Sequence, residues 1–239
     1  MMNKIIPVLI LAGLASSVMA QEAPKKWKDS AELSYVQTSG NSRTSTLSGK
    51  NLFNYDWAKA ALELAAGGFG TNSGNRVTAE QYNAAEKVSF KFPGRNYAFQ
   101  KTSWDKNRFA GIMERYDIGL GLGRLLVERP YDQFFLEVGG GYIFEDRIAS
   151  ENKSFGTCRG YGKYTRILSP TANASQALEY LGNLQDSAGY RMNAETALVT
   201  AISTHFSLKA AYVWKYVNTP AAGFRKTDTL TSVAVIANY

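Results

Sequence analysis

Hydrophobic and polar residues alternate along most of the chain with a period of two, the period of a β-strand that has one apolar and one polar face. The clearest stretch runs from Phe206 to Tyr216, where even-numbered positions are apolar and odd-numbered ones include Ser207, Lys209 and Lys215. As a helix, this stretch would scatter its lysines around every face. Its alternation therefore predicts a strand lying between an apolar medium and water.

Twelve such segments are separated by turn signals. We expect strands near residues 27–39, 42–57, 59–69, 77–91, 95–106, 111–127, 131–147, 153–168, 174–182, 189–203, 205–218 and 226–239. Segments of about 9 to 16 residues are typical of strands that cross a membrane obliquely. The uncertainty of the boundaries leaves counts from ten to fourteen open.

The connections differ in character. Those near residues 56–59, 93–94, 129–130, 169–170 and 204–205 are tight, whereas 70–78, 146–154, 182–189 and 218–228 are mostly longer and polar. Short turns at one end, longer loops at the other and an even strand count are typical of outer-membrane barrels. The sequence thus predicts an all-β fold, a transmembrane antiparallel up-and-down β-barrel of about 12 strands.

The first twenty residues have the form of a secretory signal peptide. A charged start at Lys4 precedes the apolar residues 5–14 and the small residues Val18 and Ala20, and this apolar core is shorter than the roughly 20 residues that span a bilayer. We expect a cleaved signal peptide at 1–20 and a barrel domain at 21–239, with an uncleaved anchor as the alternative. Because no later stretch resembles a transmembrane helix, the exported product is a barrel or a soluble β protein.

Aromatic residues gather near the expected strand ends, where membrane proteins place their interfacial girdles. They are Trp27, Tyr35, Tyr55, Trp57, Tyr97, Trp104, Tyr142, Trp214, Tyr216 and Tyr239. The chain ends with Val233, Val235 and Tyr239 at alternate positions, a pattern like the C-terminal signal read by barrel assembly machinery, although Ile236 breaks it. Glu86 and Lys101 fall on the lipid faces that the alternation assigns.

Composition agrees with a barrel whose strands are half polar. The 239 residues include 6 Pro, 21 Gly and 13% aromatics, and the formal net charge is +7. Lys and Arg are spread singly among acidic and aromatic residues, so no basic cluster traces a phosphate backbone and no nucleic acid partner is expected. The expected partners are outer-membrane lipid, including lipopolysaccharide phosphates, and anions within the lumen.

Several charged and glycine positions fall on the polar faces of their strands and should line the lumen. They are Arg115, Gly119, Gly121, Gly123, Glu137, Gly139, Gly141, Arg191, Glu195, Lys209 and Lys215. The glycines on two neighbouring strands would leave one wall bare. Such a strip gives room to an inward-folded loop, to long side chains from the opposite wall or to a solute; alternatively, glycine only eases curvature.

Candidate chemistry is sparse. His205 is the only histidine and Cys158 the only cysteine, so the chain offers neither a disulfide nor a cluster of metal ligands. The Gly119–Gly123 run repeats glycine every second residue without a following helix, which differs from a nucleotide-binding loop. We expect no cofactor, no metal and no catalysis.

Four motifs resemble those of the YdiY-like family, named salt-induced outer membrane proteins. They are Thr38-Ser39-Gly40-Asn41-Ser42, Asn107-Arg108-Phe109-Ala110-Gly111, Gly119-Leu120-Gly121-Leu122-Gly123 and Lys226-Thr227-Asp228-Thr229. The resemblance covers essentially the whole mature chain, with Asn107 standing where the family pattern has Asp. It implies an outer-membrane β-barrel of uncharacterised activity.

Two functions remain open at this point. A narrow, porin-like channel or facilitator for small polar or anionic solutes is favoured by the charged lumen positions. The alternative is a closed-lumen structural or stress-related protein of the cell envelope, because a twelve-stranded barrel holds little free space. An outer-membrane enzyme would need a Ser or Thr beside His205.

Overall fold

Twelve antiparallel strands close into one barrel in this computed structural model, which describes residues 26–239 except 42, 44, 74–75 and 149–150. The predicted signal peptide, residues 1–20, lies outside the described residues. The strands are β1 (Trp27–Ser39), β2 (Ser45–Asp56), β3 (Ala60–Ser73), β4 (Arg76–Phe92), β5 (Asn96–Asn107), β6 (Ile112–Glu128), β7 (Asp132–Arg147), β8 (Lys153–Ser169), β9 (Ala172–Asn183), β10 (Tyr190–Ala201), β11 (Phe206–Val217) and β12 (Thr227–Asn238).

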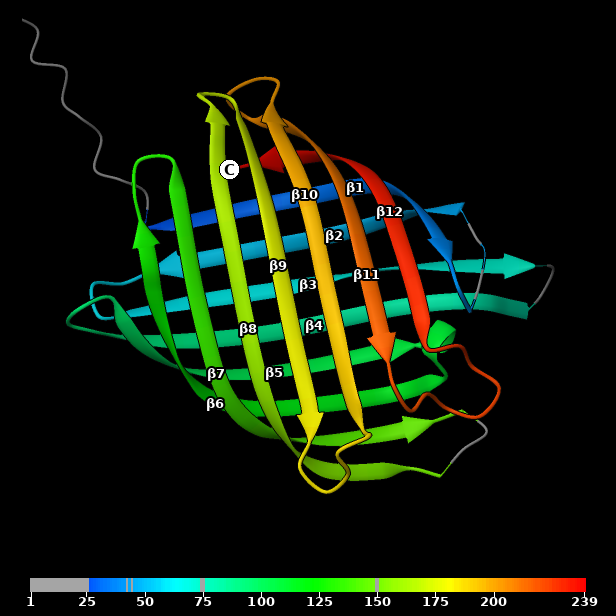
Figure 1. Ribbon diagram of the computed structural model, residues 1–239. Coiled ribbons are helices and arrows are strands. Elements are labelled where there is room, and N and C mark those ends of the chain that lie inside the picture. The colour runs from blue at the N-terminus through cyan, green and yellow to red at the C-terminus, as the bar shows by residue number, and fades with distance from the viewer. Residues whose placement is uncertain (1–25, 42, 44, 74–75, 149–150) are drawn as a thin grey trace, which may run out of the picture.

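Each strand pairs with its neighbours in sequence, and β1 pairs with β12 (Figure 1). The predicted fold class and strand number are therefore confirmed. A 3-10 helix, η1 (Arg108–Ala110), links β5 to β6. Among the described residues, no helix is long and apolar enough to cross a membrane.

The outward face of the barrel carries an apolar belt. On β6, Leu120 is 65% exposed and Leu122 is 61% exposed, and Val138 on β7 is 57% exposed. The positions between them point inward, among them Gly121 and Glu137. In water such exposure would be costly, so this surface is suited to hydrocarbon.

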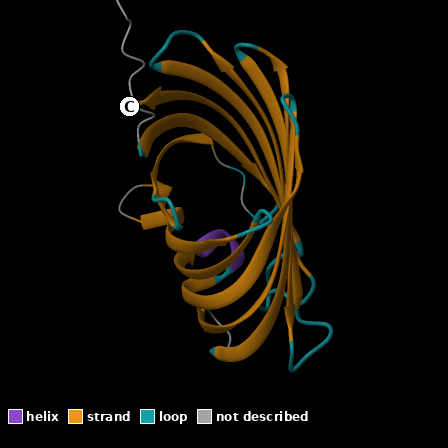
Figure 2. Cartoon of the chain, turned by 90° about the vertical axis from the view of Figure 1, so that its left-hand side faces the viewer, coloured by secondary structure: helices purple, strands orange, loops and turns teal. Residues whose placement is uncertain are grey.

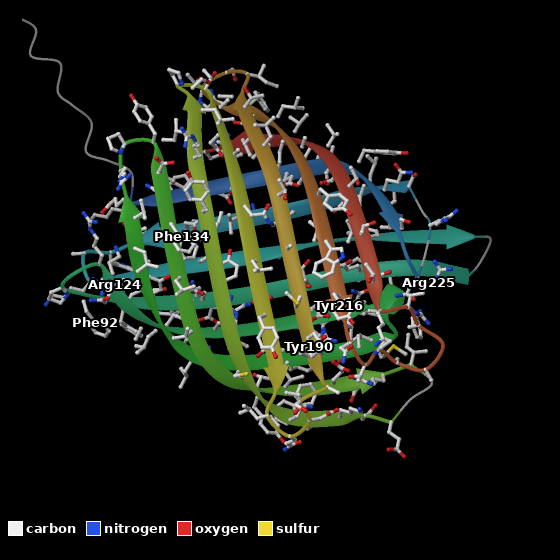
Figure 3. All side chains as sticks on the ribbon, in the orientation of Figure 1. Phe92, Arg124, Phe134, Tyr190, Tyr216 and Arg225 are labelled. Atoms are coloured by element: carbon white, nitrogen blue, oxygen red, sulfur yellow. The ribbon has the colours of Figure 1, made fainter. Side chains whose placement is uncertain are left out.

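Aromatic side chains mark both ends of this belt. Figure 3 shows Phe92 and Phe134 toward one end and Tyr190 and Tyr216 toward the other, as expected of interfacial girdles. Tyr97 is an exception to the predicted set. Its hydroxyl donates a hydrogen bond to an inward carboxylate, at 2.8 Å, so it belongs to the lumen.

The two ends of the barrel differ. The five tight turns lie at the end where the described chain begins and finishes, here called the termini end; the remaining connections form the loop end. The loop expected at 70–78 is wrong, because β3 runs to Ser73 and β4 begins at Arg76, paired beyond a bulge at Thr71 and Asn72. Glycine, asparagine and threonine there suggested a turn, but the backbone ladder continues through them.

Two strands bend sharply. Figure 1 shows β8 to β11 running steeply in front of the nearly horizontal β2 to β5, with β6 and β7 curving from one layer to the other. A Cβ atom on Gly139 would lie 2.5 Å from the Leu120 carbonyl oxygen, and one on Gly141 equally close to the Ile118 carbonyl oxygen. Glycine therefore does ease the curvature at this bend.

The loop end is closed over by the connection between β11 and β12, residues 218–226. A Cβ atom on Gly111, which has a φ of +72°, would lie 2.7 Å from the Phe224 ring and 3.0 Å from the Ala221 methyl carbon. Because β5 and β6 stand opposite β11 and β12 in the ring of strands, this contact spans the mouth. Figure 2 shows η1 within the outline of the barrel.

Two of the family-like motifs meet at the seam between β1 and β12. The Asp228 carboxylate accepts hydrogen bonds from the Asn41 backbone N–H at 2.7 Å and from its Nδ2 at 2.9 Å. Asn41 Nδ2 is also 3.1 Å from the Arg225 carbonyl oxygen, and the Arg225 N–H donates to Asn41 Oδ1. These bonds tie the first turn of the barrel to its last loop.

We predict that Asp228→Ala lowers the free energy of unfolding by about 1 to 2 kcal/mol, because it removes a charged acceptor from two donors. Urea unfolding in lipid vesicles, followed by tryptophan fluorescence, measures this. Asp228→Asn keeps one acceptor oxygen and should lose less. Wild-type stability in the alanine variant would contradict a role for this contact in closing the barrel.

Candidate functional site

The interior of the barrel is the candidate site, and the eleven residues predicted to line it lie on the inward faces of their strands. The glycines pair across β6 and β7, Gly119 with Gly141 and Gly121 with Gly139. The charged positions take part in inward ion pairs, except Lys215, which lines a cavity at the loop end. The barrel thus gathers into one space residues that lie far apart in the sequence.

A first group, the Glu137 cluster, consists of Lys87, Tyr97, Glu137, Arg159 and Glu179. Glu137 is 1% exposed and accepts hydrogen bonds from Lys87 Nζ, from the Tyr97 hydroxyl at 2.8 Å and from Arg159 Nη1 at 2.9 Å. Arg159 Nε also donates to Glu179 at 2.6 Å. The buried carboxylate is fully bonded, so this part of the lumen is filled by a fixed network.

Aromatic rings cover the glycine strip. Phe99 is 4% exposed, and a Cβ atom on Gly121 would lie 2.5 Å from its Cζ; a Cβ on Gly123 would overlap the Tyr97 ring. Lys87 Nζ lies 4.9 Å from the Phe99 ring centre, within cation–π range. The space beside Gly121 and Gly123 is therefore taken by side chains of the adjacent strand β5.

A second group, the Glu145 cluster, lies near the loop end. Glu145, 2% exposed, accepts from Arg115 Nη2 at 2.6 Å, from Arg147 Nε at 2.5 Å and from Arg191 Nη1 at 3.4 Å. Arg115 also lies 3.6 Å from Asp105. Three guanidinium groups thus share the carboxylates of Glu145 and Asp105, and Asp117 lies on the same inward face of β6.

A third group lies midway along the opposite side of the lumen. Lys209 Nζ is 3.4 Å from Glu32 Oε2 and 3.3 Å from Glu195 Oε1, so it bridges β1 and β10. Its surroundings are more open than those of Glu137, because Glu195 keeps 41% of its side chain exposed. Water therefore reaches this group.

Three cavities follow the inward face of β1 from one end of the barrel to the other. The one at the termini end has a volume of about 650 Å³ and is lined by Lys28 and Ser30. The middle one, of about 150 Å³, is lined by Glu32 and Ser34, and the one at the loop end, of about 10 Å³, by Thr38. Since the last holds about one water molecule, the cavities become smaller toward the loop end.

Two lysines that line these cavities form no ion pair with any described residue. Lys50 lines the middle cavity and Lys215 the cavity at the loop end. Within the part of the chain that the structure describes, no carboxylate oxygen lies within 4.0 Å of either ammonium group. Glu32 stands opposite Lys50 and Asp228 opposite Lys215 in the neighbouring strands, so each ammonium group faces a carboxylate without being held in a close ion pair.

The residues considered for catalysis are not assembled into a site. The His205 ring Nδ1 lies 3.0 Å from the Thr204 hydroxyl in an exposed turn at the termini end. A catalytic triad also requires a carboxylate or amide bonded to the other ring nitrogen. Among the described residues, no such group bonds it. Cys158 is exposed on the outward face, and the described residues contain no group of three His, Cys, Asp or Glu that could hold a metal ion.

Reasoning from the sequence missed most of the Glu137 cluster and assigned Lys101 to the lipid face. Lys101 points inward, 3.8 Å from Glu179, and pairs with Lys87 and Gly119 in the neighbouring strands. Its strand β5 carries aromatic residues on both faces. Those at odd-numbered positions point inward, as Lys101 does, although aromatic residues usually indicate the lipid face. The charges of β4, β8 and β9 at alternate positions were the signal that could have revealed the cluster.

Comparison with known proteins agrees with this architecture. The family described as "Protein of unknown function, DUF481" matches residues 31–239. The uncharacterized protein YdiY of Escherichia coli (strain K12) is 28% identical over 217 residues, which cover 89% of this chain and 83% of that protein.

Among solved structures, the NanC porin is similar with a TM-score of 0.58 at 8% identity, covering 87% of this chain and 98% of that one. The KdgM porin has a TM-score of 0.52 at 11% identity, covering 88% and 99%. The translocator domain of the autotransporter NalP from Neisseria meningitidis has a TM-score of 0.54 at 11% identity, covering 92% and 90%. These likenesses show the fold of an outer-membrane barrel.

We predict that Gly123→Ala destabilises the barrel by about 1 to 3 kcal/mol, because the new methyl group overlaps the Tyr97 ring. In a protein that already carries Tyr97→Leu, the Gly123→Ala substitution should lower the free energy of unfolding by less. Gly139→Ala meets backbone atoms instead and should not be rescued. Urea unfolding of these five variants, which include Gly139→Ala with Tyr97→Leu, measures this, and equal losses from Gly123→Ala with and without Tyr97 would contradict the packing described.

Glu137→Ala should lower the free energy of unfolding by about 3 kcal/mol, because it leaves Lys87 and Arg159 without their shared carboxylate. The matched control is Glu151→Ala, since Glu151 is exposed between β7 and β8 and has no ion pair within the described residues; it should change stability by less than about 0.5 kcal/mol. The same unfolding assay compares the two. A loss no larger than that of the control would show that the cluster is dispensable.

Proposed function

The chain belongs to the DUF481 family of proteins of unknown function, and we propose that it acts as a narrow channel in the cell outer membrane for small anionic or polar solutes. The carrying observation is the series of cavities along the inward face of β1, lined at two levels by lysines without a close carboxylate. A path with fixed positive charge concentrates anions. The proposal extends to an absence of catalysis, as the sequence leads us to expect.

The orientation follows from how such barrels are built. The termini end, with its short turns, faces the periplasm, and the loop end faces outward. An anion from outside then meets the arginines of the Glu145 cluster first and the constriction at Lys215 and Asp228 next. The predicted signal peptide and the C-terminal Val233, Val235 and Tyr239 support export and insertion by barrel assembly machinery, with lipopolysaccharide around the loop end.

Solved barrels of similar fold include proteins named porins, which agrees with a transport role. At 8% to 12% identity they share the fold alone, so the proposal rests on the charges and cavities of this chain.

A closed-lumen envelope protein is the second candidate, and a specific observation favours it. The Glu137 and Glu145 carboxylates are nearly inaccessible, and the cavity at the loop end is no larger than about 10 Å³. A barrel in this state would pass water and small ions poorly. Its function would then reside in its loops.

Conductance in a planar lipid bilayer distinguishes the two candidates. We expect the refolded protein to give steady openings with a reversal potential on the anion-selective side in a salt gradient. Lys215→Glu should lower the anion-to-cation permeability ratio about threefold or more, since a change of roughly one kT in local potential alters ion concentration by that factor.

The matched control is Arg124→Glu, which makes the same charge change on the outward face of β6 (Figure 3). It should leave selectivity unchanged. A folded, heat-modifiable barrel that gives no openings would overturn the channel proposal and favour the closed-lumen protein.

A further inference from the structure

One acidic side chain lies in the apolar belt itself. Glu86 is exposed on the outward face of β4, four residues from Tyr82 toward the loop end and four from Phe90 toward the termini end. Four strand residues span about 13 Å. A glutamate side chain is too short to reach the headgroups over that distance, so Glu86 is fixed near the middle of the membrane.

The barrel gives this carboxylate no partner. Its cross-strand neighbours are Leu64 on β3 and Thr102 on β5. No hydrogen bond or ion pair joins Glu86 to any side chain among the described residues. An acidic group in a membrane with no partner in its own chain marks a site of interaction.

The outward surface around Glu86 is less apolar than that of β6. It includes the following small and polar residues on four adjacent strands, here called the β2–β5 patch: Gly49, Asn51, Ala66, Ala84, Glu86, Gln100 and Thr102. Leu64, Val88 and Trp104 lie among them. By contrast, β6 presents Ile118, Leu120 and Leu122 outward. Small residues let two membrane proteins approach closely, and polar ones bond across such contacts.

We propose that the β2–β5 patch is the interface with a second copy of this chain, in a twofold dimer that gives Glu86 its missing partner. The patch is self-complementary, because it holds an acceptor carboxylate together with amide and hydroxyl donors. Gln100 uses one N–H to bond Thr102 Oγ1 at 2.6 Å and keeps its second for another acceptor. A twofold axis through the patch places Glu86 of each copy against the donors of the other.

Lipid is a poor substitute, because hydrocarbon offers no hydrogen bond to a carboxylate. An unrelated membrane protein would have to bring matching donors of its own, whereas the second copy carries them already. The dimer surface is on the outside of the barrel and does not involve the lumen. The dimer proposal and the channel proposal can therefore be tested independently.

Site-directed cross-linking tests the geometry. In a Cys158→Ser background, Ala84→Cys places a thiol beside Glu86, and the matched control Ala210→Cys places one on the outward face of β11, five strands away around the ring. We expect a short bismaleimide to give covalent dimer several-fold more from Ala84→Cys than from Ala210→Cys in lipid vesicles. Equal yields would overturn the proposal.

Association measured against protein-to-lipid ratio tests the chemistry. Glu86→Leu should weaken dimerisation about tenfold, the size expected from losing a membrane hydrogen-bonded contact, while Glu86→Gln should retain most of it. Glu86→Leu should also raise the stability of the monomer at high dilution in lipid, which shows that the variant folds. Dimerisation of the leucine variant as strong as that of the wild type would overturn the proposal.

Discussion

The hydrogen bonds between β1 and β12 are the interaction on which the whole structure depends. A bilayer interior has no water to satisfy free N–H and C=O groups, so a sheet survives there only when its two edges pair. Ten residue pairs, from Ser30 with Asn238 to Ser39 with Thr229, join this chain into a ring. The contact between Asn41 and Asp228 lies just beyond that seam and brings together two family-like motifs that are distant in sequence.

Closure has a consequence for every inward side chain. Polar groups that face a narrow lumen are partly withdrawn from water, and such charges are tolerated where they are paired and bonded. Glu137 and Glu145 satisfy this requirement with three cationic or hydroxyl donors each. The glycines of β6 and β7 make this arrangement possible. Because they have no side chain, the backbone can bend there and the rings of Tyr97 and Phe99 can pack against it.

Much of this architecture could be predicted from the sequence, because a membrane strand has a simple period and its two faces meet different solvents. A count of about twelve strands and the inward positions of β6, β7, β10 and β11 followed from alternation together with turn signals. Prediction failed where alternation is weak. Aromatic residues on both faces of β5 misplaced Tyr97 and Lys101, and turn-forming residues near 70–78 concealed a continuing ladder whose stability comes from the neighbouring strand.

Some charged residues form ion pairs within the barrel, and others have no ion-pair partner among the described residues. Glu137 and Glu145 are explained, because lysine and arginine side chains inside the barrel neutralise them. Lys50 and Lys215 in the lumen are left without a close carboxylate, and so is Glu86 on the lipid side. Since an uncompensated charge in a low-dielectric setting is costly to keep, those residues point to partners outside the chain. The lysines indicate a mobile anion, and the glutamate indicates a second barrel.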